Sequence, residues 1–139
     1  MTKLTRCLLL PWLILAAGCA TTTPADITGA GTQLAIREIQ TREYDTLDKQ
    51  MTMRSVIATL QDLGFNIDQA QLELGTVTGT RLHEYTMRMT VTTVEKDNGR
   101  IAVRANARIG ENSVQDPATY QDFFVVLDKA MFLTLNKID

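Results

Sequence analysis

The sequence predicts an α+β fold, a two-layer sandwich in which an antiparallel sheet of about four or five strands carries two helices on one face. Two observations lead to this prediction. Apolar residues recur every three or four positions near residues 47–63 and 117–136, as in amphipathic helices. They alternate with polar residues near residues 85–92 and 101–109, as in half-buried strands. Because both helices must bury their apolar stripes against one sheet face, the opposite face is expected to contact water.

Residues 1–18 have the pattern of a lipoprotein signal peptide. Lys3 and Arg6 begin a segment whose apolar run is too short for a membrane-spanning helix, which needs about 20 residues. The residues that a lipoprotein signal peptidase recognises follow directly, at Leu15, Ala16, Ala17 and Gly18. Cys19 is therefore expected to carry a diacylglycerol and an acylated amino group. An ordinary secretory signal with a coincidental cysteine, or a short membrane anchor, is the alternative.

Processing before Cys19 sets the compartment and the remaining chemistry. Ala20 stands where an aspartate would favour the inner membrane, so the sequence favours an outer-membrane anchor with the domain facing the periplasm. Exposure on the outer leaflet stays open. Cys7 would leave with the signal peptide, and no thiol would remain for a disulfide or a metal site. Two of the 14 basic residues would leave as well, and the more acidic product argues against a nucleic-acid partner. No cofactor is expected beyond the covalent lipid.

Residues 19–33 are expected to hold the lipidated N-terminus and a flexible tether, and residues 34–139 a single domain. The segment Ala20–Gly31 is small and Thr-rich and has few apolar residues to offset the entropy of ordering. The domain is expected to begin with an edge strand over Leu34–Tyr44. The remaining length is that of one small domain.

The first domain helix is predicted over residues 47–63. Asp45 or Thr46 is expected to be its N-cap, and Gly64 stands where a left-handed residue ends a helix. Two short strands are expected next, around residues 65–67 and 77, with Gly75 and Gly79 as breakers.

A hairpin is predicted around Asn98-Gly99. A two-residue turn there would set Val91 opposite Asn106 and mix apolar and polar side chains on one face. A three-residue turn with Gly99 in the left-handed conformation pairs Val91 with Ala105 instead. A bulge in the earlier strand would have the same effect. We predict the three-residue turn or the bulge.

The last helix has a clear N-terminal signal. Asp116 is expected at the N-cap and Pro117 at the first helical position, and the helix is expected to run to Asn136. Its predicted apolar face consists of Tyr120, Phe123, Phe124, Leu127, Ala130, Met131 and Leu135.

No residue pattern predicts catalysis or a metal site. His83 is the only histidine and has one acidic neighbour in sequence, Glu84, whereas a metal or acid–base site needs several converging groups. Ser55 falls in a predicted helix without the glycines of a nucleophile elbow, and Ser113 falls in a loop. The protein is therefore expected not to be an enzyme.

Arginines cluster on the predicted water-facing side of the sheet. Arg100, Arg104 and Arg108 project from one strand, and Arg88 is expected beside them on the neighbouring strand. We interpret these four residues as a partner-binding face for a carboxylate-rich protein, a lipid phosphate or a peptidoglycan peptide. The alternative is a solvated face whose arginines pair with nearby acids. Charged residues along 37–45 also mark an edge that either accepts a partner strand or is protected from one.

Four segments resemble a family of small, largely uncharacterised Gram-negative lipoproteins: IREIQTREYDT, ATLQDLGFNID, LGTVTGT and DPATYQDFFVVLDKAMFL. The resemblance covers Ile36 to Leu133 and implies no active-site residues. Members of the family often carry a longer Gly-rich insertion where this chain has the short RLHEY connection. More loosely, the order of elements is similar to the helix-grip domains of the lipoprotein C component of the barrel-assembly machine, which implies a fold and no partner.

These patterns together predict an outer-membrane-anchored periplasmic lipoprotein. Its domain is expected to act as a non-catalytic binding or assembly module of an envelope complex for transport, secretion or barrel assembly. The alternative is a carrier or sensor of a lipid or small apolar ligand. That alternative requires a cavity among Met53, Met87, Met89, Phe123, Phe124 and Met131.

Overall fold

The computed structural model describes residues 27–136. The predicted signal peptide, Cys19 and residues 19–26 of the predicted tether lie outside these residues. The helices and strands are, in chain order, α1 (Ile27–Ile39), β1 (Thr41–Tyr44), α2 (Lys49–Asp62), β2 (Asn66–Gln71), β3 (Thr76–Leu82), β4 (Thr86–Glu95), β5 (Ile101–Ile109), β6 (Asn112–Ser113) and α3 (Pro117–Leu135).

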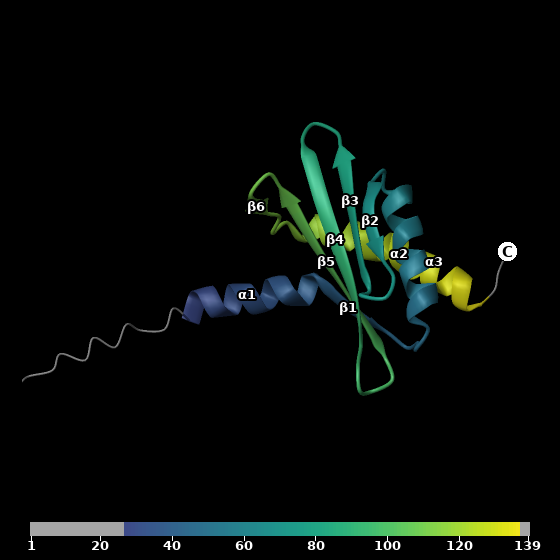
Figure 1. Ribbon diagram of the computed structural model, residues 1–139. Helices are drawn as coiled ribbons and strands as arrows, with labels where there is room; N and C mark the ends of the chain where they lie inside the picture. Colours follow the sequence, from purple (N-terminus) through teal and green to yellow (C-terminus); the bar gives the residue numbers. More distant parts are fainter. Residues whose placement is uncertain (1–26, 137–139) are drawn as a thin grey trace, which may run out of the picture.

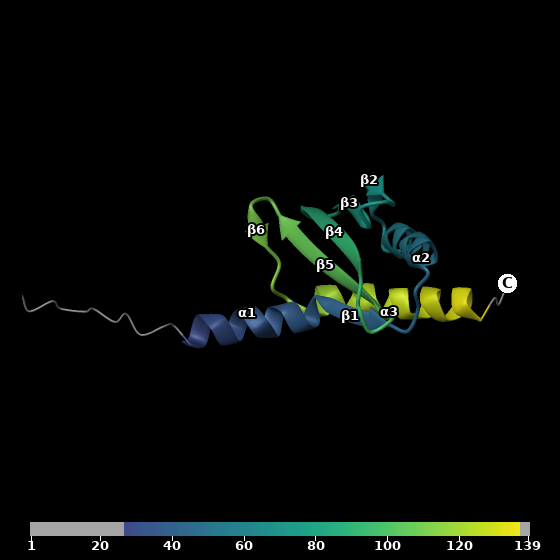
Figure 2. The same ribbon diagram turned by 60° about the horizontal axis from the view of Figure 1, so that its bottom comes forward.

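The strands form one antiparallel sheet in the order β1-β5-β4-β3-β2. The short strand β6 also pairs with β5, at the end of β5 that β1 does not reach. Helices α2 and α3 pack against each other on one face of the sheet, whereas α1 extends away from the domain ahead of β1 (Figures 1 and 2). The predicted α+β sandwich is confirmed, with one helix more than the sequence indicated.

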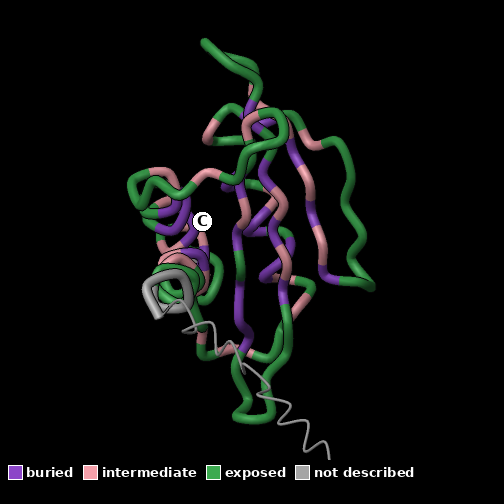
Figure 3. Tube along the Cα trace, turned by 90° about the vertical axis from the view of Figure 1, so that its left-hand side faces the viewer, coloured by how far each residue is buried: buried purple, intermediate pink, exposed green. Residues whose placement is uncertain are grey.

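The hydrophobic core lies between the sheet and helices α2 and α3 (Figure 3). Residues 87, 89 and 91 of β4 and residues 101, 103, 105 and 107 of β5 face this core and are buried, while the residues between them face away. The helices contribute the fully buried side chains of Met53, Val56, Leu60, Phe123 and Leu127. The strand alternation predicted for these segments is thus present on both strands.

The hairpin between β4 and β5 has the register that the sequence predicted. Val91 pairs with Ala105, and the turn closes through a hydrogen bond from Lys96 N to Arg100 O of 2.8 Å. Gly99 has a φ of 77° and occupies the left-handed position of a three-residue turn. This register places Arg88 directly opposite Arg108.

Helix α3 also follows its prediction at both ends. The Asp116 side chain caps it by accepting a hydrogen bond from Ala118 N, and Asn136 forms the C-cap. Its predicted apolar face is buried through Met131 except at Ala130, which is half-buried, and Leu135 is 51% exposed. The final turn of the helix extends past the sheet and has no core to cover it (Figure 1).

The predicted edge strand over Leu34–Tyr44 is wrong in its first half. Residues 34–39 belong to α1, and only Thr41–Tyr44 form a strand. Ile36 and Ile39 are half-buried at a helical spacing of three, and α1 contacts α3 and β1. Packing against these elements favours the helix over an extended chain. The same helix begins at Ile27, so residues 27–33 of the predicted tether are helical as well.

Two local predictions around α2 and β3 also need correction. The N-cap of α2 is Asp48, which accepts a hydrogen bond from Met51 N at 2.8 Å, rather than Asp45 or Thr46. Gly79 lies inside β3 and does not break it. A Cβ atom at Gly79 would approach Asn66 O to 3.1 Å, so the glycine permits close contact with the start of β2. The predicted left-handed Gly64 is confirmed, with a φ of 80°.

Candidate functional site

Helices leave one face of the sheet uncovered, and we call it the open face. Its residues alternate with the core residues along each strand. It is formed mainly by Thr76, Thr78, Thr80, Thr86, Arg88, Thr90, Thr92, Arg104, Asn106 and Arg108. The threonines of β3 and β4 stand opposite one another, and the hydroxyls of Thr78 and Thr90 lie 3.1 Å apart. Short hydroxylated side chains therefore cover most of this face, and the longer arginine side chains extend beyond them.

Arg88 and Arg108 are directly paired across β4 and β5. Like charges at directly opposite positions of a sheet repel each other and destabilise it. Arg104 lies on the same face of β5, where it is paired with Thr92 of β4 on one side and with Thr41 of β1 on the other. Arg100 precedes β5, at the other end of that strand from Arg108. Three of the four predicted arginines therefore lie together on the open face. The fourth, Arg100, lies just outside it, in the turn between β4 and β5.

The four arginines differ in their ion pairs. Arg100 Nε lies 2.6 Å from Asp45 Oδ1, and its Nη1 lies 3.8 Å from Glu43 Oε2. Arg108 Nη2 donates to the backbone oxygen of Glu111 at 2.7 Å and lies 3.5 Å from its carboxylate. Within residues 32–136, neither Arg88 nor Arg104 forms an ion pair. Two of the four arginines are thus paired with acids, and the other two are exposed without an ion pair among these residues.

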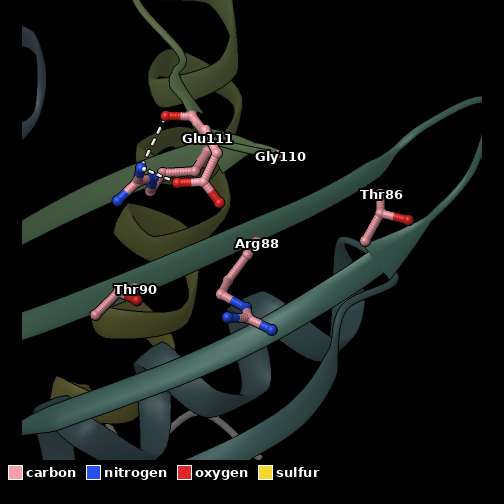
Figure 4. Close-up of a pocket in the computed structure, with 6 residues that line it drawn as sticks. Thr86, Arg88, Thr90, Gly110 and Glu111 are labelled. Atoms are coloured by element: carbon pink, nitrogen blue, oxygen red, sulfur yellow. Dashed lines mark hydrogen bonds and ion pairs between the residues drawn. The ribbon is translucent and has the colours of Figure 1, made fainter.

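A pocket of about 440 Å³ opens between the arginine pair and the turn that leads into β6. Thr86, Arg88 and Thr90 of β4 line one side, and Gly110 and Glu111 lie across from them (Figure 4). The side chain of Glu111 is fully exposed, so its carboxylate covers Arg108 only from the rim. Two guanidinium groups and two hydroxyls offer hydrogen-bond donors suited to an oxyanion.

Glu111 was not predicted as part of this site. The sequence offered one signal, its spacing of three residues from Arg108, but β6 was not anticipated and the turn was treated as a loop. Gly110 has a φ of 57° and reverses the chain there, which returns Glu111 toward the arginine pair.

The residues considered for catalysis lie on three different segments of the fold. His83 is exposed in the connection between β3 and β4, and Ser55 is buried on α2 with its hydroxyl 3.9 Å from Met51 Sδ. Ser113 is exposed on β6. Among the described residues there is no group of three or more His, Cys, Asp or Glu side chains arranged to hold a metal ion.

The side chains proposed to surround an apolar ligand pack against one another instead. All six are between 0 and 2% exposed and belong to the single core cluster. The rings of Phe123 and Phe124 meet edge to face with centroids 5.1 Å apart. A pocket of about 230 Å³ does reach Met87 and Met89 at one end of the core, but Arg81, Asp116 and Asp122 also line it.

The charged edge expected along residues 37–45 is engaged within the domain. Arg42 contacts the carboxylate of Asp128 on α3 and lies over the ring of Phe124, 4.9 Å from its centroid. Tyr44 Oη donates to the same carboxylate at 2.8 Å. Burial, together with this hydrogen bond, raises the pKa of Tyr44 well above its ordinary value. We call these contacts the β1–α3 clasp, because they attach the edge strand to the helix layer.

No protein-family model and no curated protein sequence matches this chain. The resemblance to small Gram-negative lipoproteins therefore stays a prediction. Among residues 27–136, no helix is both long and apolar enough to cross a membrane.

Proposed function

We propose that this chain is a non-catalytic binding module of the Gram-negative cell envelope whose open face receives an acidic component of an envelope assembly. One observation carries the proposal: Arg88 faces Arg108 across β4 and β5. This pairing costs the isolated domain stability, because the two charges repel. An anion placed between the two guanidinium groups would replace that repulsion with two charge-assisted hydrogen bonds.

The surroundings of the pair support the same proposal. Arg88 has no acidic partner among the described residues, and the one acid near Arg108 sits at the exposed rim of the pocket. Both arginines stand on paired strands, so their Cα atoms are held about 5 Å apart and both side chains start from neighbouring points of the open face. From these positions the two guanidinium groups can both reach one anion and donate hydrogen bonds to it.

We further propose that lipid on Cys19 holds this domain at the periplasmic side of the outer membrane. Attachment to a membrane raises the effective concentration of the domain near partners in the same layer, so modest contacts at the open face suffice for binding. Transport, secretion and barrel-assembly machineries are the candidate assemblies.

A photo-crosslinking amino acid at Thr90 tests the binding face in living cells. Thr90 lines the pocket, and Val125 on the exposed side of α3 is the matched control position. We expect a specific adduct from position 90, its loss when Arg88→Gln and Arg104→Gln are combined, and no such adduct from position 125. Equal adducts from both positions, or an adduct unaffected by the arginine variants, would show that the open face is not the binding surface.

The anchor has its own test. Metabolic labelling with a palmitate analogue is expected to label the wild-type chain and not the Cys19→Ser variant. Label retained by the variant would contradict lipidation at this residue.

A further inference from the structure

We infer that the open face binds an acidic glycan of the cell wall through two anionic groups, one between Arg88 and Arg108 and the other at Arg104. This inference rests on the proposed function and specifies its ligand. The ligand class is a glycan strand that carries carboxylates on peptide stems, as peptidoglycan does.

The spacing of the unpaired cations is the first argument. Arg88 stands level with Arg108 in the sheet, and Arg104 stands level with Thr92, four residues further along β4. Four residues of antiparallel strand span about 13 Å. The open face thus presents two separate positive sites on a rigid frame, whereas a ligand with one charge needs only one of them.

The surface between the two sites is the second argument. Thr90 pairs with Asn106 midway between them, and both side chains are partly accessible. Hydroxyl and amide groups both donate and accept hydrogen bonds, as sugar hydroxyls and N-acetyl groups require. The sugar chain of the glycan can therefore lie across the threonines between the two sites while its carboxylate-bearing peptide stems reach the arginines.

The absence of apolar surface there decides between ligand classes. Among the described residues, the large apolar side chains exposed on this face are Leu82 and Val94, at opposite ends of β3 and β4. A protein partner normally buries an apolar centre in its interface, and a lipid needs apolar surface for its acyl chains. The polar surface between the two sites therefore favours a hydrated polymer over either of them.

The repeated carboxylates of a polymer explain how such exposed contacts could give useful affinity. A single partly exposed ion pair binds weakly. A polymer that engages both sites gains from the high effective concentration of its second charge once the first has bound. The face is therefore expected to prefer a polymer with repeated carboxylates over a small monoanion.

Sedimentation with purified peptidoglycan sacculi tests this inference, using the full chain isolated from cells in mild detergent. Arg88→Gln and Arg104→Gln are each expected to lower the apparent affinity on the order of fivefold, and the double variant by more than about tenfold. The matched control combines Arg54→Gln and Lys129→Gln. It removes the same charge from exposed positions of α2 and α3 and is expected to bind like the wild type.

Amidation of the sacculus carboxylates supplies the second arm. Wild-type binding is expected to fall to the level of the double variant, because the anionic groups have been removed from the ligand side. Unchanged binding to amidated sacculi, or an equal loss in the control variant, would overturn the inference.

The crosslinking at Thr90 separates the two proposals. Arginine-dependent adducts to a protein, with no sedimentation on sacculi, would refute the glycan and leave the binding module in place. The absence of both adducts and sedimentation would refute both.

Discussion

Replacing Tyr120 with phenylalanine tests how α3 is fixed to the sheet. Tyr120 is fully buried, and its hydroxyl joins α3 to three other segments of the chain. It donates to Val114 O at 2.6 Å, and it accepts from Gln40 Nε2 at 3.1 Å and from Ala107 N at 3.3 Å. These contacts lie where β5 passes from its pairing with β1 to its pairing with β6, so the hydroxyl substitutes for a missing strand neighbour.

The size of the effect follows from the groups that lose their partner. Phenylalanine keeps the ring and its packing, so no large cavity forms. Gln40 as a residue is 2% exposed and Ala107 is fully buried, so neither Gln40 Nε2 nor the Ala107 N–H has ready access to water. Val114 is only partly buried, and its carbonyl can be hydrated. With about 1–3 kcal/mol for each of these two buried polar groups left unsatisfied, we expect a loss of about 2–6 kcal/mol in the free energy of unfolding.

Urea unfolding followed by far-ultraviolet circular dichroism measures this loss. The only tryptophan, Trp12, lies in the predicted signal peptide and offers no probe of the domain. A cycle with Gln40→Met isolates the side-chain hydrogen bond, and the double variant is expected to lose less than the sum of the single variants. Additive losses, or a loss for Tyr120→Phe below about 0.5 kcal/mol, the range of neutral surface changes, would refute the reasoning.

Three further predictions concern the turns, the arginine pair and the clasp. Gly75 has a φ of 72° and its Cβ would lie 2.6 Å from a backbone oxygen, so Gly75→Ala is expected to cost at least about 1 kcal/mol more than Gly99→Ala, where φ is 77° but the space is open. Urea midpoints compare the two variants, and equal losses would contradict the steric argument. Arg88→Thr is expected to raise stability by about 0.2–1 kcal/mol by removing the repulsion from Arg108, with a smaller gain in 1 M salt; a loss of stability would show that the pair does not repel. Because only the unfolded chain releases the Tyr44 proton above about pH 10, stability falls there, and Tyr44→Phe is expected to flatten that fall in urea midpoints measured from about pH 8 to 11. An unchanged slope would contradict it.

The sequence predicted best where local rules and burial agree. The register of the β4–β5 hairpin follows from alternation along both strands and from one glycine that favours the left-handed turn. Helix α3 has an aspartate and a proline at its start and a continuous apolar stripe behind them. Each of these signals lies within about 20 residues of chain, so no distant contact was needed to interpret them.

The errors lie where a distant segment decides the local structure. Asp45, Thr46 and Asp48 are all suitable N-caps, but Asp45 forms an ion pair with Arg100, 55 residues away, and Asp48 caps α2. The strand before it, β1, is attached to Asp128 of α3, which is 84 residues from Tyr44. Residues 34–39 likewise become helical where they meet α3, a contact that no local pattern reveals.

The candidate site divides in the same way. Spacing along a strand was enough to predict that the arginines share one face, and the hairpin register brings Arg88 opposite Arg108. The acids that neutralise Arg100 are Glu43 of β1 and Asp45 of the loop after it. Both are more than 50 residues away in sequence and come close because β1 pairs with β5. Only the folded arrangement therefore distinguishes the neutralised Arg100 from Arg88 and Arg104.

Stabilising contacts and the arginine pair occupy opposite sides of the sheet. The core, the clasp and the Tyr120 hydroxyl all lie on the side of the helices, and each of them favours the fold. On the open face, the pairing of Arg88 with Arg108 opposes the fold without a compensating contact for Arg88 among the described residues. Features that break a local rule without compensation are expected at functional sites, because stability alone would select against them. A variant that is more stable and binds less well would therefore be the signature of this face, and Arg88→Thr is the substitution expected to show both effects at once.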